Sequence, residues 1–491
     1  MFLLGIDIGT SSIKVSVVDV KTQTCVASTQ YPEKEVEIKS IEKGWAEQSP
    51  EEWWTNTKKA IEQLSNSAQI DLKKIKAIGI AYQMHGLVVV DKLQNVLRDS
   101  IIWCDSRAVS IGEKAFDEIG REKCLHHLLN APGNFTASKL AWVAKNEPEI
   151  YRRIDKIMLP GDFIAMKLTG QIATSISALS EGIFWDFSAK EISKDILQYY
   201  NFDKDLIPEV KPVFSNHGYL KDEIAEELGL IPGVIVGYKS GDQPNNALSL
   251  NVLRPGEVAA TAGTSGVIYG VSDGLPSDKQ SRINTFAHVN YTTDSQHTGV
   301  LLCINGTGSM YRWAKSCFAP DKSYQELNHL AASAPIGSKG LMVLPFGNGA
   351  ERMLNNKYTG AQVLGIDLNT HTSADIFRAV QEGIAFAFRY GLDIMRENGM
   401  QPKVIRAGKT NLFLSEVFTQ TFVDVTNTPV ELYENDGSVG AAIGAGIGAG
   451  IFNNLEDAFK DHKLIKRIET KNVDKYEPIY QEWKQILLQK I

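Results

Sequence analysis

Cysteines are few in this sequence, and they are not clustered. The 491 residues include five cysteines, an odd number scattered along the chain, with no Cys-x-x-Cys pair and no Cys/His group. Disulfide frameworks and structural zinc sites both need closely spaced cysteines in recognisable patterns. Both are therefore excluded, and we expect reduced thiols in a cytoplasmic protein.

Long apolar runs and basic runs are also missing. The apolar residues 2–4 have no basic segment before them and are too short for a signal peptide. The glycine-rich stretch 441–452 falls far below the roughly 20 residues needed to cross a bilayer, so a buried helix fits it better. The net charge of -7, with no basic run, argues against nucleic-acid binding. We therefore expect neither a membrane nor a nucleic acid as a partner.

Two common nucleotide-binding signatures do not occur either. There is no Gly-x-x-x-x-Gly-Lys-Ser/Thr sequence, and no Gly-x-Gly-x-x-Gly opens a strand–helix–strand unit. Any nucleotide site in this chain must therefore be built differently. The chain is too long for one core, and its 43% hydrophobic and 22% charged residues are ordinary for a globular protein of two or three domains.

A strand–turn–strand unit with a polar turn occurs once in each half of the chain. The first turn is Gly9-Thr10-Ser11-Ser12, and the second is Gly263-Thr264-Ser265-Gly266. This weak repeat indicates two duplicated α/β domains that face a cleft, with a boundary near 248–255 that gives domains 1–248 and 249–491. The predicted strands are 3–6, 13–18, 75–81, 88–90, 101–103, 234–237, 257–262, 267–271 and 404–405, the predicted helices are 55–64, 245–250 and 441–452, and 241–244 is a predicted turn.

The two polar turns are candidate phosphate clasps. Gly9 lets the backbone turn without a Cβ clash, so the following amides and hydroxyls can point at phosphate oxygens. A plain hairpin explains one copy as well, but a second copy favours a pair that holds a nucleotide tail across the cleft. Asp7, at the end of the first strand, is placed to hold Mg²⁺ or its waters. The expected phosphate contacts are Thr10, Ser11, Ser12, Gly263, Thr264 and Ser265.

Asp242 is the candidate catalytic base. It follows the apolar strand 234–237, and active sites of α/β folds collect at such strand ends. Phosphoryl transfer to an alcohol needs a group that accepts the hydroxyl proton, and a carboxylate can do this. A simple helix cap is an equally good interpretation of this position, and the two roles are compatible.

Polar residues after two other strands are candidate sugar contacts. The segment Gln83-Met84-His85-Gly86 carries a Gln and a His that could hydrogen-bond sugar hydroxyls. The alternative is a core histidine whose hydrogen bonds are satisfied, the more common role of an isolated histidine. Asp105 and Arg107 could likewise bind hydroxyls or simply pair with each other.

Glycines near the C-terminus have two interpretations. A glycine lets a flat adenine ring approach the backbone, and we favour this role for Gly408. Small residues also allow helices to pack closely, and we favour this role for Gly444 and Gly446.

Together these segments resemble the FGGY carbohydrate kinases, and within them the xylulose kinases, over nearly the whole chain. The Gln-Met-His-Gly segment is the match most specific to xylulose kinases. The segments that carry the resemblance are 5–11, 45–48, 52–54, 83–86, 159–160, Asp162, 168–170, 241–242, 263–266 and 382–385.

The resemblance implies two actin-like (ribonuclease H-like) domains with a cleft between them. The N-terminal domain would hold the sugar site, the first hairpin and the catalytic aspartate, and the C-terminal domain the second hairpin and the adenine site. The implied reaction is the ATP- and Mg²⁺-dependent phosphorylation of a ketopentose, D-xylulose to D-xylulose 5-phosphate, in a homodimer. The implied sites are Gln83, Met84, His85 and Gln243 for the sugar, Asp242 as base, Asp7 for Mg²⁺, and Gly308, Gly408 and Asn411 for ATP.

Two segments depart from the family pattern and keep alternatives open. Residues 406–411 replace a run of glycines, and Gln243-Pro244-Asn245-Asn246 replaces a common Asn-Ala-Ala. One alternative is therefore another sugar of the family, such as ribulose, gluconate, fuculose or rhamnulose. An alternative of another class is an actin-like ATP-binding chaperone or regulatory module, which would not need Asp242 beside a polar sugar pocket.

Overall fold

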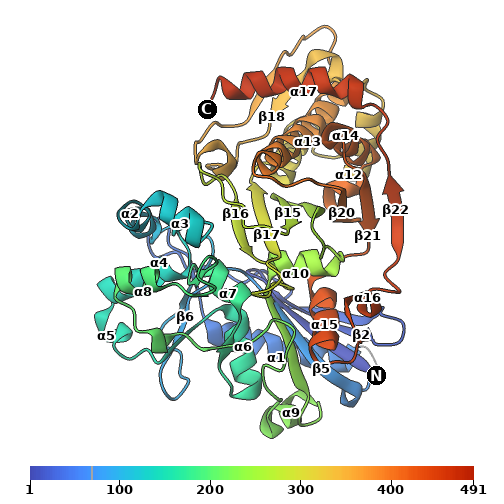
Figure 1. Ribbon diagram of the computed structural model, residues 1–491. Coiled ribbons are helices and arrows are strands. Elements are labelled where there is room, and N and C mark those ends of the chain that lie inside the picture. The colour runs from blue at the N-terminus through green and yellow to red at the C-terminus, as the bar shows by residue number, and fades with distance from the viewer. Residues whose placement is uncertain (68–69) are drawn as a thin grey trace.

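Two β-sheets, each covered by helices, form the two halves of the molecule shown one above the other in Figure 1. The computed structural model describes residues 1–67 and 70–491. The first sheet has the order β13-β5-β1-β2-β3, and the second has the order β16-β17-β15-β14-β20-β21-β22. Their strands are β1 (Phe2–Ile8), β2 (Ile13–Asp19), β3 (Cys25–Tyr31), β5 (Ile75–Tyr82), β13 (Ile235–Gly241), β14 (Glu257–Ala262), β15 (Gly266–Ser272), β16 (Asn284–Ala287), β17 (Thr298–Ile304), β20 (Val404–Gly408), β21 (Val430–Tyr433) and β22 (Leu464–Ile468).

The two sheets share one topology. In the first sheet, β1 pairs antiparallel with β2 and parallel with β5, and β5 pairs parallel with β13. In the second, β14 pairs antiparallel with β15 and parallel with β20, and β20 pairs parallel with β21. The order β3-β2-β1-β5-β13 thus corresponds to β17-β15-β14-β20-β21, with β16 and β22 added at the edges. The repeat that the two hairpins predict extends to whole sheets, which confirms the two-domain α/β fold.

The helices and the short strands complete both halves. The helices are α1 (Pro50–Ser67), α2 (Val109–Ile119), α3 (Arg121–His127), α4 (Thr136–Asn146), α5 (Pro148–Tyr151), α6 (Pro160–Thr169), α7 (Ile176–Glu181), α8 (Lys194–Tyr200), α9 (Asp222–Leu228), α10 (Asp242–Ser249), α11 (Gly308–Phe318), α12 (Tyr324–Ala332), α13 (Ser373–Glu397), α14 (Glu416–Thr426), α15 (Gly437–Gly448), α16 (Leu455–Ala458) and α17 (Val473–Leu488). The short strands are β4 (Glu47–Gln48), β6 (Val88–Val90), β7 (Ser100–Ile101), β8 (Lys156–Met158), β9 (Ala173–Thr174), β10 (Trp185–Asp186), β11 (Glu191–Ile192), β12 (Glu209–Val210), β18 (Met342–Leu344) and β19 (Gln362–Leu364). Among the described residues, no helix is long and apolar enough to cross a membrane.

Most of the predicted elements are confirmed, and two are corrected. The strand predicted at 101–103 is wrong beyond Ile101, because the chain turns at Trp103 rather than continuing its pairing. The turn predicted at 241–244 is also wrong. Helix α10 begins at Asp242, directly after β13, so the strand passes into the helix without a loop.

Helix α15 joins the two halves of the chain. It is encoded after most of the second sheet, yet it packs against β1, β5 and β13 of the first sheet (Figure 1). The close approach depends on glycine, because a methyl group at Gly79 of β5 would overlap the carbonyl oxygen of Ala441. A Cβ atom at Gly444 would lie 2.6 Å from the Tyr238 ring, and one at Gly446 would lie 2.5 Å from the Phe452 ring. The packing role of Gly444 and Gly446 is thereby confirmed.

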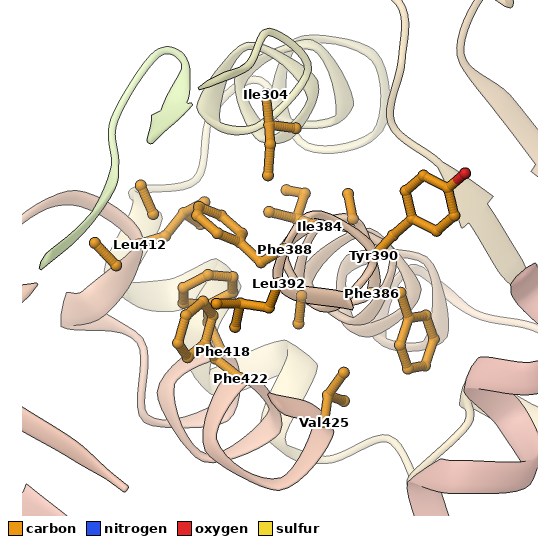
Figure 2. Packing of buried hydrophobic residues seen from close by; sticks show 14 of the residues in the cluster. Ile304, Ile384, Phe386, Phe388, Tyr390, Leu392, Leu412, Phe418, Phe422 and Val425 are labelled. Atoms are coloured by element: carbon orange, nitrogen blue, oxygen red, sulfur yellow. The ribbon is translucent and has the colours of Figure 1, made fainter. Parts of the chain in front are cut away.

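An aromatic core holds the second half together. Figure 2 shows Phe386 and Phe388 of α13 among the buried side chains around this helix, with Phe418 and Phe422 of α14 beside Phe388. The ring centroids of Phe388 and Phe422 lie 5.2 Å apart in an edge-to-face arrangement, a favourable geometry for aromatic pairs. Leu412 extends this core to the segment that lines the main cavity of the structure.

Candidate active site

Asp7 is the second-last residue of β1, just before the first turn, and lies among other acidic groups. Burial, together with the negative charges of Asp242 and Asp436, raises the pKa of Asp7 to about 7, while Lys14 opposes the shift. Asp436 caps the start of α15 and forms an ion pair with Lys14. A methyl group at Gly437 would overlap the Asp7 carboxyl, so α15 can approach only with a glycine here. Asp436 was missed by sequence reasoning, because it is far from Asp7 in the chain.

The surroundings of Asp7 fit a divalent cation. The charges of Asp242 and Asp436 raise the pKa of the buried Asp7 carboxyl, and a bound positive charge would oppose this effect. Mg²⁺ usually takes one or two carboxylates and completes its shell with phosphate oxygens and water. The described part of the chain has no cluster of three or more His, Cys, Asp or Glu side chains arranged around one metal point. A cation at Asp7 would therefore need phosphate and water ligands as well.

Asp242 is the first residue of α10. Gly241 occupies the cap position and no side-chain cap bond forms, so the interpretation of Asp242 as a helix cap is wrong. Burial raises the pKa of Asp242 to about 6, against hydrogen bonds from the side chain and backbone of Gln243. Asp242 is a half-buried residue, and its carboxyl is mostly ionised at neutral pH, as a proton acceptor must be.

The geometry of His85 determines which ring nitrogen carries the proton. Its Nδ1 lies 3.0 Å from the backbone oxygen of Glu181, and because a carbonyl can only accept, Nδ1–H is the donor. Burial and the Lys139 charge lower the pKa of His85 to about 3, so the ring is neutral and Nε2 keeps a free lone pair. Phe135 and Phe286 hold the ring, with centroids 4.7 and 5.5 Å from it. Since Phe286 belongs to β16, both halves of the protein position this acceptor.

Glu181 lies beneath Asp242 and His85 and was not foreseen from the sequence. Its side chain is buried, and the hydroxyl of Tyr82 hydrogen-bonds its carboxyl. Burial and the charge of Asp242 raise the pKa of Glu181 well above its usual range, which favours the protonated carboxyl. A Cβ at Gly241 would lie 2.8 Å from Oε2 of Glu181. The glycine before Asp242 therefore leaves room for the Glu181 carboxyl. No local pattern marks a single Glu at the end of α7 as part of a site.

Gln83 is hydrogen-bonded to the turn of the first hairpin. Its Oε1 accepts from the hydroxyl of Thr10 at 3.3 Å, and its Nε2 donates to Oε1 of Gln48 at 3.0 Å. Gln48 in turn donates to the backbone oxygen of Thr10 at 2.7 Å. The indole of Trp103 also donates to the Thr10 hydroxyl, at 2.9 Å. Gln83 is only 3% exposed, and its amide is hydrogen-bonded to Thr10 and Gln48. Ser11 and Ser12, in contrast, remain partly exposed in the turn.

Asp105 and Arg107 pair with each other, as one of their two interpretations predicts. Nη2 of Arg107 lies 2.8 Å from Oδ2 of Asp105, and both side chains are buried. Arg107 also bonds Glu47 at 2.7 Å and lies over the Trp45 ring, 3.8 Å from its centroid. These groups form a structural network below the surface.

A cavity of about 730 Å³ lies beside the second hairpin, within the size range of small-ligand sites. Four of the predicted nucleotide contacts line it, namely Gly263, Thr264, Gly308 and Asn411. Residues that sequence reasoning did not select also line it, including Tyr311, Arg312 and Asn328.

The second hairpin is tied to the start of α11. The backbone N–H of Gly308 donates to the oxygen of Gly263 at 2.9 Å, and a methyl group at Gly308 would overlap that oxygen. Ser265 and Gly408 do not line the cavity, and Gly408 lies at the end of β20 against Asn435. The glycine at 308 therefore has a clear structural reason, and the assignment of Gly408 to adenine stays a prediction.

Comparison with known proteins relates both halves to one family. Residues 2–249 match the N-terminal domain and residues 258–449 the C-terminal domain of the FGGY family of carbohydrate kinases. A xylulose kinase of Staphylococcus epidermidis is 31% identical, over 99% of this chain and 96% of that protein. The crystal structure of xylulose kinase from Rhodospirillum rubrum aligns with a TM-score of 0.88 at 26% identity, over 100% of this chain and 99% of the other. A Plasmodium falciparum glycerol kinase with ADP shares the fold, with a TM-score of 0.89 at 20% identity over 100% of this chain and 98% of the other.

Proposed function

The chain belongs to the FGGY family of carbohydrate kinases, and on this premise we propose that it uses ATP to convert D-xylulose to D-xylulose 5-phosphate. The observation that carries the proposal is the pairing of two acceptors around Glu181. One is the carboxylate of Asp242, and the other is the neutral Nε2 of His85. The names of relatives such as the Staphylococcus epidermidis xylulose kinase support a ketopentose as the acceptor.

Asp242 acts as the general base in this proposal. Its carboxylate accepts the proton of the terminal sugar hydroxyl as the sugar oxygen bonds to the γ-phosphorus of ATP. The bond from that phosphorus to the bridging oxygen breaks, and ADP leaves. His85 accepts a hydrogen bond from a second hydroxyl through Nε2 and so orients the sugar. Met84, which lies 5% exposed beside Gly241, and Gln243 border the same position.

The nucleotide is proposed to span the two hairpins. Its base would lie in the cavity lined by Gly308 and Asn411, and its phosphates would meet the turns 9–12 and 263–265. Asp7 would hold Mg²⁺, which when bound neutralises charge on the phosphate oxygens. The halves 1–248 and 249–491 would close around the substrates and exclude water.

A sugar panel tests the proposal. ADP release is measured for the purified chain at fixed ATP and Mg²⁺ with D-xylulose, ribulose, gluconate, fuculose and rhamnulose. We expect the highest kcat/KM with D-xylulose and almost no ADP without sugar. A higher value with another sugar would establish that sugar as the substrate. ADP release that no sugar stimulates would instead favour an actin-like ATP-binding module.

A further inference from the structure

Arg352 is a cation for which the described part of the chain offers no anionic partner. It begins η4 (Arg352–Leu354) in the second half and is partly buried. Among the described residues, no carboxylate pairs with its guanidinium, and the neighbouring carboxylate of Glu351 is engaged by the backbone N–H of Asn305 at 3.0 and 3.2 Å. A partly buried cation is costly unless a counter-charge reaches it, so an anionic ligand is the natural partner to look for.

The segment that carries Arg352 is tied to the second hairpin. Besides the Glu351 bonds, the side-chain amide of Asn305 donates to the backbone oxygen of Ala350 at 2.9 Å. The hydroxyl of Thr307, two residues after Asn305, donates to the backbone oxygen of Gly263 at 3.2 Å. Hydrogen bonds thus tie the residues just before Arg352 to Asn305, and the same chain segment is bonded through Thr307 to the turn proposed to hold the phosphates.

The charge of Arg352 also acts on groups near the proposed sugar site. Burial raises the pKa of Cys303 on β17 to about 11; the charge of Arg352 opposes this shift, and the charge of Asp242 adds to it. One thiol is therefore within electrostatic reach of both the arginine and the proposed base. After burial and Lys139, Arg352 also lowers the pKa of His85. Cys303 pairs with Val267 of β15, directly after the second turn, so Arg352 acts on a residue beside that turn as well as on His85.

We propose that Arg352 is a catalytic residue that binds the phosphoryl group while it passes from ATP to the sugar. This inference rests on the proposed function. The transferring group carries negative charge on three equatorial oxygens, and a planar guanidinium can donate two parallel hydrogen bonds to them. Arg352 stays protonated throughout, while Asp242 takes the hydroxyl proton and ADP leaves. The second half would thus add a charge that the hairpin amides alone do not supply.

Variants of Arg352 test the inference through kcat. Arg352→Gln should lower kcat roughly 10³-fold, the lower end for an arginine that stabilises this transition state, with KM for sugar within about threefold of the parent. Arg352→Lys should recover part of the rate because it restores charge without the bidentate geometry. Guanidinium ions should partly rescue Arg352→Gly. Arg121→Gln is the matched control, since Arg121 is exposed, forms an ion pair with Asp117 and lies over the Phe116 ring on the surface.

The outcomes separate this inference from the proposed function. A parent chain without sugar-stimulated ADP release overturns the proposed function and the inference with it. An active parent overturns the inference alone if Arg352→Gln keeps its kcat, or if the loss appears only in KM for the sugar. Circular dichroism and ADP binding check that each variant folds. If Arg352→Gln does not fold, the test uses kcat of Arg352→Lys and the rescue of Arg352→Gly by guanidinium ions. If neither variant recovers part of the parent kcat, the inference is overturned.

Discussion

The ionisation of Asp242 predicts how turnover depends on pH. Its pKa of about 6 makes the carboxylate about nine-tenths ionised at pH 7 but about one-tenth ionised at pH 5. Only the ionised form can accept the hydroxyl proton. The rate should therefore fall about tenfold between these two pH values, with the break near pH 6.

Asp242→Asn isolates the contribution of this group. The amide cannot accept the proton, so kcat should fall by roughly 10²–10⁴, while sugar binding measured by calorimetry should largely survive. Because ATP itself titrates in this range, the rate of the parent should be divided by that of the variant at each pH. The ratio then reports Asp242 alone.

Two results would refute the assignment of Asp242. One is a ratio that stays constant between about pH 5 and pH 8, which would mean that no group near this position titrates during turnover. The other is an Asn variant that turns over near the parent rate. Loss of sugar binding in that variant would instead show that Asp242 holds the substrate in its ground state.

Three further predictions concern stability. Gly79→Ala would push a methyl group into the carbonyl of Ala441, and overpacking should lower the free energy of unfolding by about 1–3 kcal/mol in urea titrations. Lys239→Met should cost about 3–5 kcal/mol, because it leaves Asp162, 2.5 Å from Lys239 Nζ and 2% exposed, as an uncompensated buried charge. Acidification from pH 7 to 5 should lower the free energy of unfolding by ~2 kcal/mol through His217, because burial lowers its folded pKa to about 3 while the unfolded chain takes up a proton near 6.5.

Each of these stability predictions has a control. Gly274→Ala, where the nearest atom would be 3.8 Å away, should change stability by less than about 0.5 kcal/mol. Replacing Asp162 together with Lys239 by apolar residues should be less harmful than Lys239→Met alone. His217→Asn should reduce the loss of stability on acidification, and an unchanged pH dependence would show that other groups cause it.

Local sequence was sufficient to predict the two hairpins and four residues that line the cavity beside the second one. A short apolar strand followed by Gly-Thr-Ser specifies its own turn, because glycine relieves the steric limit and the flanking residues pair with their neighbours. The apolar strand before Asp242 is likewise visible in the local sequence. Local signals failed where one element passes directly into another, as at the start of α10, because a turn and a first helical turn have similar residue preferences.

By itself, the sequence determined the two-domain fold and the reaction class. Repeated hairpins and apolar strands follow from the order of residues along the chain. Only the tertiary structure decided that the pKa of Glu181 is raised, that Asp436 lies near Asp7, that α15 crosses to the first sheet, and that no carboxylate of the described residues pairs with Arg352. Proton affinity and charge pairing depend on burial and on neighbours brought from distant parts of the chain. The order of residues does not reveal those neighbours until the chain has folded.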